Sequence, residues 1–227
     1  MGLVGRVGQV GPVGRVGQVG LVGRVGPVGR VGLTRAIVTT LAAAAVASVV
    51  LIAQQPVRVL VRTELGDILL EIDTGRAPAT SANFLRYVDA GHYDGGTFHR
   101  TVKMDNQPDS PVKIEVIQAG VNADRTKDGL PPIPIERTSV TGLRHTNGAI
   151  SMARGQPDSA TSGWFICIND QASLDFGGAR NPDGQGFAAF GRVVQGMDVV
   201  RKIQQASNTD AQRLTPPIKI LKAARVP

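Results

Sequence analysis

The side chains best suited to chemistry in this chain fall in four short segments that lie far apart in the sequence. The segments are Thr97-Phe98-His99-Arg100, Val116-Ile117-Gln118-Ala119-Gly120, Ala149-Ile150-Ser151-Met152-Ala153-Arg154 and Trp164-Phe165-Ile166-Cys167-Ile168. Arg100 stays charged at any ordinary pH and presents a planar fork of hydrogen-bond donors. Val116 and Gln118 are two residues apart, so in a strand they face the same side. The segments therefore offer a cationic donor and an amide beside apolar residues, which suits a site that grips a polar group next to an apolar cleft.

Other kinds of chemistry find less support in the sequence. The three histidines have no Cys or His partner at zinc-site spacing, and no acidic loop has the spacing of calcium ligands, so we predict no metal and no cofactor. Cys167 is the only cysteine, which excludes an intramolecular disulfide, and its apolar neighbours predict a buried strand residue. Ser159 and Ser162 lie in no nucleophile-elbow sequence, which makes a hydrolase a distant hypothesis.

The composition favours one folded domain and argues against a nucleic-acid partner. Hydrophobic residues make up 42% of the 227 residues, which is enough for one core but leaves too little chain for a second domain. The formal net charge is +7, yet five arginines lie before residue 54, where there is no acidic residue. The rest of the chain has 20 basic and 18 acidic residues, without the alternation of aromatic and basic residues that base stacking requires.

Residues 1–33 form a repeat with glycine at every third position from Gly2 to Gly32. Collagen has this period, but it also needs abundant proline between the glycines. Pro12 and Pro27 are the only prolines at those positions, so we do not expect a stable triple helix. We interpret the segment as a disordered Gly-Val-rich repeat. The alternative is that it is translated DNA upstream of the true start codon.

Residues 34–53 are predicted to be a secretory signal peptide. Arg35 precedes an uncharged stretch, 36–53, that is rich in Ala and Val, and Ala45-Val46-Ala47 supplies a small-residue cleavage site. An uncleaved membrane anchor is the alternative, because the uncharged stretch barely reaches the length of a spanning helix. A buried core helix ranks third, since a polar stripe is missing. We therefore expect residues 54–227 to be periplasmic or secreted, or anchored to the membrane if the leader is not cleaved.

Short elements joined by Gly and Pro turns must position the four segments. Residues 57–63 and 68–72 predict a β-hairpin with a turn between them. Helices are predicted from Pro78 to just before Gly91 and over Met197–Gln204. The other predicted strands are Thr97–Arg100, Val112–Gln118, Ala149–Ala153, Trp164–Ile168, Ala188–Val193 and Ile218–Ala223. Many short strands with two helices favour a mainly β fold, a closed antiparallel β-barrel.

In this order and spacing, the four segments resemble those of the cyclophilins, a family of peptidyl-prolyl cis-trans isomerases. The resemblance covers roughly residues 57–226, and the run Asp158-Ser159-Ala160-Thr161-Ser162 is similar to the exported bacterial branch. It implies a closed eight-stranded antiparallel barrel capped by two helices. It also implies that the protein catalyses rotation about Xaa-Pro bonds in proline-containing polypeptides and so assists the folding of exported proteins. We expect the protein to be a monomer.

The resemblance implies a role for each site residue. Arg100 matches the arginine that stabilises the transition state as the amide rotates. His99 is grouped with the substrate-binding residues and supports the site, because bond rotation transfers no proton. The other substrate-binding positions bind the substrate backbone or form the apolar pocket for the proline ring, and they are Val116, Gln118, Ala153, Arg154, Phe165, Leu174 and Phe187. For Leu174, an ordinary core role is an equal alternative.

Several departures from the family pattern bear on the pocket. Residues 101–113 form an insertion, which is either a partner-recognition element or a tolerated surface loop. Glu115 stands where an aromatic residue usually walls the pocket, so that Ile114 or Ile117 substitutes for it or the wall is more polar. Gly163 replaces a glutamine, which predicts the loss of one polar contact to substrate.

Two further departures concern ligands. Ser173 stands in place of a tryptophan that many eukaryotic members use to bind cyclosporin, and Phe187 replaces a histidine, so we expect weak cyclosporin binding. Gly163 and Glu115 favour a rival to the isomerase hypothesis, in which the fold grips proline segments as a catalytically weak binding or chaperone module.

Overall fold

The structure is a computed structural model of the chain that describes residues 56–227, with side chains described for all of these except residues 209 and 210. The predicted repeat at 1–33 and the predicted signal peptide or anchor at 34–53 lie outside the described residues, so both stay predictions. Among the described residues, no helix combines the length and the apolar character needed to span a membrane.

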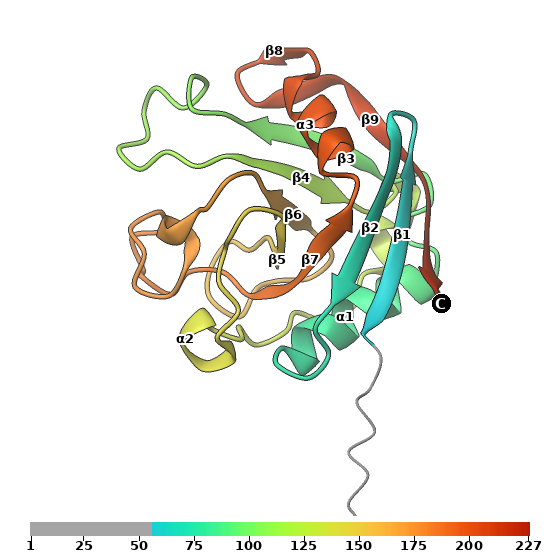
Figure 1. Cartoon of the computed structure of the whole chain (residues 1–227), viewed down its shortest axis with the longest axis horizontal. Helices are drawn as coiled ribbons and strands as arrows, with labels where there is room; N and C mark the ends of the chain where they lie inside the picture. Colours follow the sequence, from blue (N-terminus) through green and yellow to red (C-terminus); the bar gives the residue numbers. More distant parts are fainter. Residues whose placement is uncertain (1–55) are drawn as a thin grey trace, which may run out of the picture. The chain divides into compact units, whose positions relative to one another are not determined.

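An antiparallel β-barrel forms the body of the described region (Figure 1). Around the ring, each strand is hydrogen-bonded to the next in the order β1 (Val57–Thr63), β2 (Gly66–Ile72), β7 (Ala189–Gln195), β5 (Ala149–Met152), β6 (Trp164–Cys167), β4 (Val116–Gly120), β3 (Thr97–Val102) and β9 (Arg213–Val226). The last of these pairs with β1, which closes a ring of eight strands. The remaining strand, β8 (Asn208–Asp210), pairs with β9 at the edge. The predicted fold class, mainly β with a closed eight-stranded antiparallel barrel, is confirmed.

The two predicted helices are both present. Figure 1 draws α1 (Pro78–Asp89) below the barrel and α3 (Met197–Gln205) above it. The N–H groups of Ala79 and Thr80 in the first turn of α1 donate to the Glu136 carboxylate at 3.1 and 2.8 Å, so a distant side chain satisfies the open end of the helix. The sequence did not predict the short helical segments α2 (Thr138–Thr141), Ala123–Asp128 and Ala172–Leu174.

Most predicted strands agree with the structure to within two residues at each end, but two differ by more. β4 begins at Val116 rather than at Val112, because the buried Gln107 side chain bonds both the N–H and the carbonyl of Ile114 and takes the place of a strand partner. β9 runs well beyond the predicted Ile218–Ala223 at both ends, since it pairs in turn with β8, β3 and β1.

Two apolar clusters occupy opposite faces of β4 and β6. Ile117, Trp164 and Ile166 belong to the main cluster inside the barrel. There the Phe84 ring lies 5.5 Å from that of Trp164 and 5.1 Å from that of Phe190, measured between centroids. The alternate residues of the same strands face a smaller second cluster, which consists of Val102, Ile114, Val116, Ala149, Phe165, Cys167 and Leu174, with Ala153 and Phe187 packed against it.

Cys167 lies fully buried in the second cluster, as predicted. Burial raises the pKa of its thiol far above the ordinary value, and the nearby Asp175 and Asp170 carboxylates raise this pKa further. The thiol therefore stays protonated, which makes it unsuited to nucleophilic chemistry.

Candidate active site

A cavity of about 260 Å³ opens onto the second apolar cluster. Small-molecule sites usually measure about 300–1,000 Å³, so this cavity suits a single side chain better than a large ligand. Its lining residues are Arg100, Ile114, Val116, Gln118, Ala153, Arg154, Phe165, Leu174, Arg180, Asn181 and Phe187. They include every predicted site residue except His99. The fold thus brings together residues from all four of the segments that the sequence singled out.

His99 is exposed and lines a different hollow of about 700 Å³, next to residues 211–215. Arg100 lines both hollows, so His99 lies beside the cavity rather than in it. Its supporting role stays a prediction.

A larger hollow, of about 740 Å³, contains none of the predicted site residues. It lies where β2 ends and beyond α2, and its three arginines, Arg76, Arg144 and Arg192, each pair with a carboxylate. Size alone therefore does not identify the site.

Phe165 forms the apolar floor of the smaller cavity and is held between two other rings. Its ring stacks on that of His145, with centroids 6.0 Å apart and planes 14° apart. On another side it meets Phe187 edge-on, with centroids 5.4 Å apart and an interplanar angle of 90°. These contacts fix the orientation of the floor.

A buried chain of hydrogen bonds holds His145 under Phe165. His145 Nδ1 lies 2.8 Å from Asp175 Oδ1, and Nε2 lies 3.0 Å from the Ser151 hydroxyl oxygen. The order serine, histidine, aspartate matches the arrangement that activates a serine nucleophile in hydrolases. However, Ser151 is 0% and His145 1% exposed, so no substrate reaches the hydroxyl. The arrangement supports the Phe165 ring and gives no support to hydrolysis.

Asp175 is the charged member of this chain of hydrogen bonds. Burial raises the pKa of its carboxyl, but the side-chain and backbone hydrogen bonds from His145, together with the Arg144 guanidinium, lower it by more, so that the pKa lies below its ordinary value. The ionised carboxylate therefore stabilises the folded state. Sequence analysis missed this pair because the two residues are 30 positions apart and belong to no metal or nucleophile motif.

Arg100 is held by two glutamine side chains. Its Nη1 donates to Gln118 Oε1 at 2.9 Å, and its Nε and Nη2 donate to Gln212 Oε1 at 2.9 and 2.6 Å. The first contact follows from the sheet, because Arg100 and Gln118 are register partners on β3 and β4. Burial lowers the pKa of Arg100 and the positive charge of Arg180 lowers it further, but an arginine remains charged at neutral pH. Since both acceptors are neutral amides, they orient the Arg100 side chain without neutralising its positive charge.

The insertion at 101–113 is tied to the segment that carries Gln212. Gln212 Nε2 donates to the Asn106 carbonyl oxygen at 3.1 Å, and Asn106 Nδ2 donates to the Ala211 carbonyl oxygen at 2.9 Å. The insertion thus helps to hold Arg100. Sequence analysis missed Gln212, which lies in no motif and is 112 residues from Arg100.

The insertion also determines which residue walls the cavity. Gln107 donates to the Ile114 carbonyl oxygen at 2.8 Å and accepts from the Ile114 N–H at 3.2 Å. Ile114 then lines the cavity, whereas Ile117 lies inside the barrel. Glu115 turns away and accepts from Asn169 at 2.7 Å. Of the alternatives left open by the sequence, the structure supports an apolar wall supplied by Ile114.

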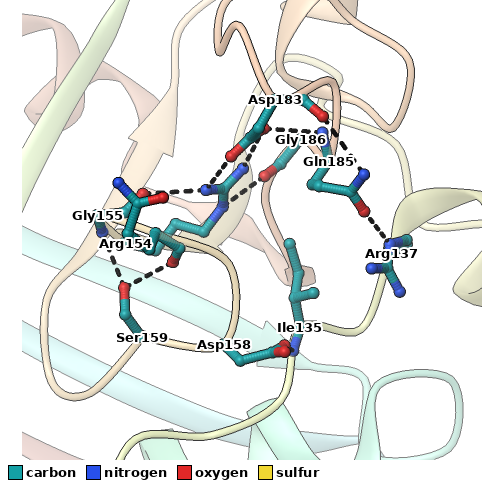
Figure 2. Close-up of polar contacts among 10 residues, drawn as sticks. Ile135, Arg137, Arg154, Gly155, Asp158, Ser159, Asp183, Gln185 and Gly186 are labelled. Carbon is teal, nitrogen blue, oxygen red and sulfur yellow. Dashed lines mark hydrogen bonds and ion pairs between the residues drawn. The ribbon is translucent and has the colours of Figure 1, made fainter.

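Arg154 lines the cavity, but its charge is already matched (Figure 2). Its Nη1 and Nη2 lie 2.8 and 3.0 Å from the two carboxylate oxygens of Asp183, and its Nε donates to the Gly186 carbonyl oxygen at 2.8 Å. Only 2% of the side chain is exposed. The Arg154 guanidinium therefore fixes the loop next to Phe187. The neighbouring residue Ala153 is held separately, because its backbone N–H donates to the Gly163 carbonyl oxygen.

Comparisons with known proteins found similar sequences and a similar fold. A protein-family model described as cyclophilin type peptidyl-prolyl cis-trans isomerase/CLD matches residues 58–225. Peptidyl-prolyl cis-trans isomerase cyp18 of Streptomyces antibioticus is 38% identical over 143 residues, which is 63% of this chain and 80% of that protein. Peptidyl-prolyl cis-trans isomerase B of Escherichia coli is 36% identical over 143 residues, with the same coverage of 63% and 80%. A crystal structure of a cyclophilin type isomerase from Cryptosporidium parvum shares the fold, with a TM-score of 0.61 at 19% identity over 76% of this chain and 99% of that one.

Replacing Gln212 by Met should lower kcat/KM for rotation of a Xaa-Pro peptide about tenfold or more. Methionine has a similar volume but accepts only weak hydrogen bonds, and a hydrogen bond to a charged group contributes about 1.5–3 kcal/mol. In an Arg100→Ala background, the same substitution should have no further effect, because Gln212 acts through Arg100. The four rates form a double-mutant cycle that measures this coupling.

Gln185→Met is the matched control for this cycle. Gln185 Oε1 also accepts from an arginine, Arg137 Nε at 2.6 Å, but does not line the cavity. Its replacement should leave kcat/KM unchanged. An equal loss on replacing Gln212 in both backgrounds would contradict the positioning role.

Replacing Asp175 by Asn should destabilise the fold more at pH 7 than at pH 3. Because the folded-state pKa of Asp175 lies below its unfolded value of about 3.9, its stabilisation is present above that value and is lost as pH falls through the folded pKa. The free energies of unfolding in urea at the two pH values measure the change. The same substitution at the exposed Asp109 should have no effect at either pH. An equal loss in the free energy of unfolding on replacing Asp175 at both pH values would contradict this interpretation.

Proposed function

The chain belongs to the cyclophilin-type peptidyl-prolyl cis-trans isomerases, and from that membership we propose that Arg100 is its catalytic residue and that its substrates are exported proteins in the course of folding. The observation that supports a catalytic role for Arg100 is its position. A guanidinium held by Gln118 and Gln212 stands at the edge of a cavity whose floor is the apolar ring of Phe165.

Rotation about a Xaa-Pro bond is slow because the amide has partial double-bond character, with a barrier of about 18–20 kcal/mol. As the bond twists, resonance weakens and electron density returns to the proline nitrogen. A fixed donor that is directed at the rotating amide therefore binds the twisted state better than the planar one. The cavity holds the proline ring against Phe165, Leu174 and Ile114, and Arg100 supplies the donor.

Magnitudes indicate that Arg100 acts together with the cavity. Moving a process from tens of seconds to milliseconds requires a gain of about 10⁴–10⁵, or roughly 5–7 kcal/mol. One preorganised donor supplies about 3–4 kcal/mol. The remainder comes from removing water around the amide and from holding the peptide part of the way to the twisted geometry.

A protease-coupled assay with a Xaa-Pro peptide tests the catalytic assignment. The wild-type protein should accelerate the phase of cleavage that is limited by the cis isomer. Arg100→Ala should reduce kcat/KM by about 10²–10³-fold while weaker peptide binding persists. Arg100→Lys should restore only part of the rate, because lysine keeps the charge but lacks the planar fork.

The outcomes of this assay separate the two hypotheses left by the sequence. Unchanged turnover in Arg100→Ala would refute the role of Arg100. A wild-type protein that binds proline peptides without accelerating their isomerisation would favour the binding or chaperone module.

The proposal of an exported substrate class is supported by the sequence before the domain. The uncharged stretch at 36–53 follows Arg35 and contains the small-residue site Ala45-Val46-Ala47. The run at 158–162, which resembles the exported bacterial branch, supports the same conclusion. We therefore place the protein in the periplasm or outside the cell, or on the membrane if the leader is retained.

Cell fractionation and N-terminal sequencing of the full chain produced in Escherichia coli test the proposed export. The domain should be found in the periplasm with a new N-terminus after Ala47. A Leu41→Arg variant, which interrupts the uncharged stretch, should remain in the cytoplasm with its leader intact. Recovery of the wild-type chain in the membrane fraction would indicate the anchor, and recovery in the cytoplasm would refute export.

A further inference from the structure

The lining of the cavity carries more positive charge than a neutral proline segment requires. Three arginines line it, Arg100, Arg154 and Arg180, and no aspartate or glutamate is among the lining residues. Arg154 is neutralised by the bidentate pair with Asp183 (Figure 2). Among the carboxylates whose side chains the structure describes, which do not include Asp210, none forms an ion pair with Arg100 or Arg180.

Arg180 is held in place by neutral groups only. Its Nη1 donates to Gln107 Oε1 at 2.9 Å, to Ser110 Oγ at 2.6 Å and to the Val112 carbonyl oxygen at 2.5 Å. All three acceptors belong to the insertion, which therefore orients the guanidinium without cancelling its charge. Among the side chains that the structure describes, which exclude those of residues 209 and 210, none accepts a hydrogen bond from Nε or Nη2 of Arg180, so one edge of the fork remains available to a ligand.

The positive charges of Arg100 and Arg180 repel each other. Burial lowers the pKa of Arg100 and the positive charge of Arg180 lowers it further, while burial lowers the pKa of Arg180 itself. A carboxylate bound between the two side chains would relieve this repulsion, since two guanidiniums and an anion form a favourable cluster. The planar fork of an arginine fits a carboxylate with two parallel hydrogen bonds.

We propose that this cavity prefers proline segments in which an acidic residue is next to the proline, and that Arg180 is the residue that recognises the carboxylate. The inference rests on the isomerase activity and deepens it by naming a substrate class. The insertion at 101–113 then has a part in specificity, because it positions Arg180.

Peptide pairs that differ only in charge test this preference. One pair has Glu or Gln directly before the proline, and the other has Glu or Gln directly after it, with isomerisation followed by NMR exchange spectroscopy. At low salt, the Glu peptide of at least one pair should have a kcat/KM about three- to tenfold above that of its Gln partner. The ratio should fall towards one as salt is raised, because the charges are partly exposed to solvent.

Substitutions at one position separate the charge of Arg180 from its structural contacts. Arg180→Gln and Arg180→Lys both lose the fork that bonds the insertion, but only the lysine keeps the positive charge. The ratio of kcat/KM for the Glu peptide to kcat/KM for its Gln partner should fall to about one in Arg180→Gln and largely persist in Arg180→Lys. Arg137→Gln is the matched control, because Arg137 also bonds a glutamine but does not line the cavity, and it should leave the ratio unchanged.

The possible results distinguish this inference from the proposed function. A wild-type protein that isomerises both Gln peptides but shows a ratio of one at each position overturns the preference alone. A ratio that survives in Arg180→Gln overturns the role of Arg180. A protein that accelerates none of the peptides overturns both the proposed catalysis and the inference that rests on it. If Arg180→Gln does not fold, the salt dependence of the wild-type ratio and the lysine variant still decide the question.

Discussion

Side chains alternate between two faces along β4 and β6, and both the barrel core and the site are built on this alternation. In each strand, one residue faces the barrel interior and the next faces outward, so Ile117 and Trp164 build the core while Val116 and Phe165 form the floor of the site. A shift of one residue in register would exchange the two sets. The position of the site is therefore fixed by the same hydrogen bonds and packing that hold the barrel together.

The two arginines of the site that face the cavity without a carboxylate partner are positioned by neutral hydrogen-bond acceptors. Arg100 is bonded by amide oxygens of Gln118 and Gln212, and Arg180 by amide, hydroxyl and backbone oxygens of the insertion. Carboxylates would hold the same side chains more strongly but would also neutralise them. Neutral acceptors direct the guanidiniums and leave their charge to act on a bound peptide, where a local dielectric below that of water strengthens the interaction. Arg154, which is paired with Asp183, shows the other solution and serves to hold a loop.

Burial decides which reactive residue types have any chemistry available to them. Ser151, His145 and Asp175 have the order and spacing of a hydrolytic triad, yet the serine and the histidine are sealed under Phe165 and act as a support for its ring. Cys167 is likewise enclosed, and burial keeps its thiol protonated. The groups that face the cavity donate hydrogen bonds or present apolar surface, which suits a reaction that rotates a bond without breaking one.

The sequence was sufficient to predict the family, the barrel, the hairpin of β1 and β2 and both longer helices, because these depend on local periodicity, turn residues and motifs such as the run before Arg100. It also named most of the cavity lining. The folded barrel was needed to show that Ile114 rather than Glu115 walls the pocket, and that Gln212 and Arg180 belong to the site. The physical reason is that these choices depend on contacts between side chains far apart in the chain, 112 residues for Arg100 with Gln212 and 73 for Gln107 with Arg180. Such contacts leave no periodic or local signal in the sequence, so they exist only once the barrel has brought its loops together.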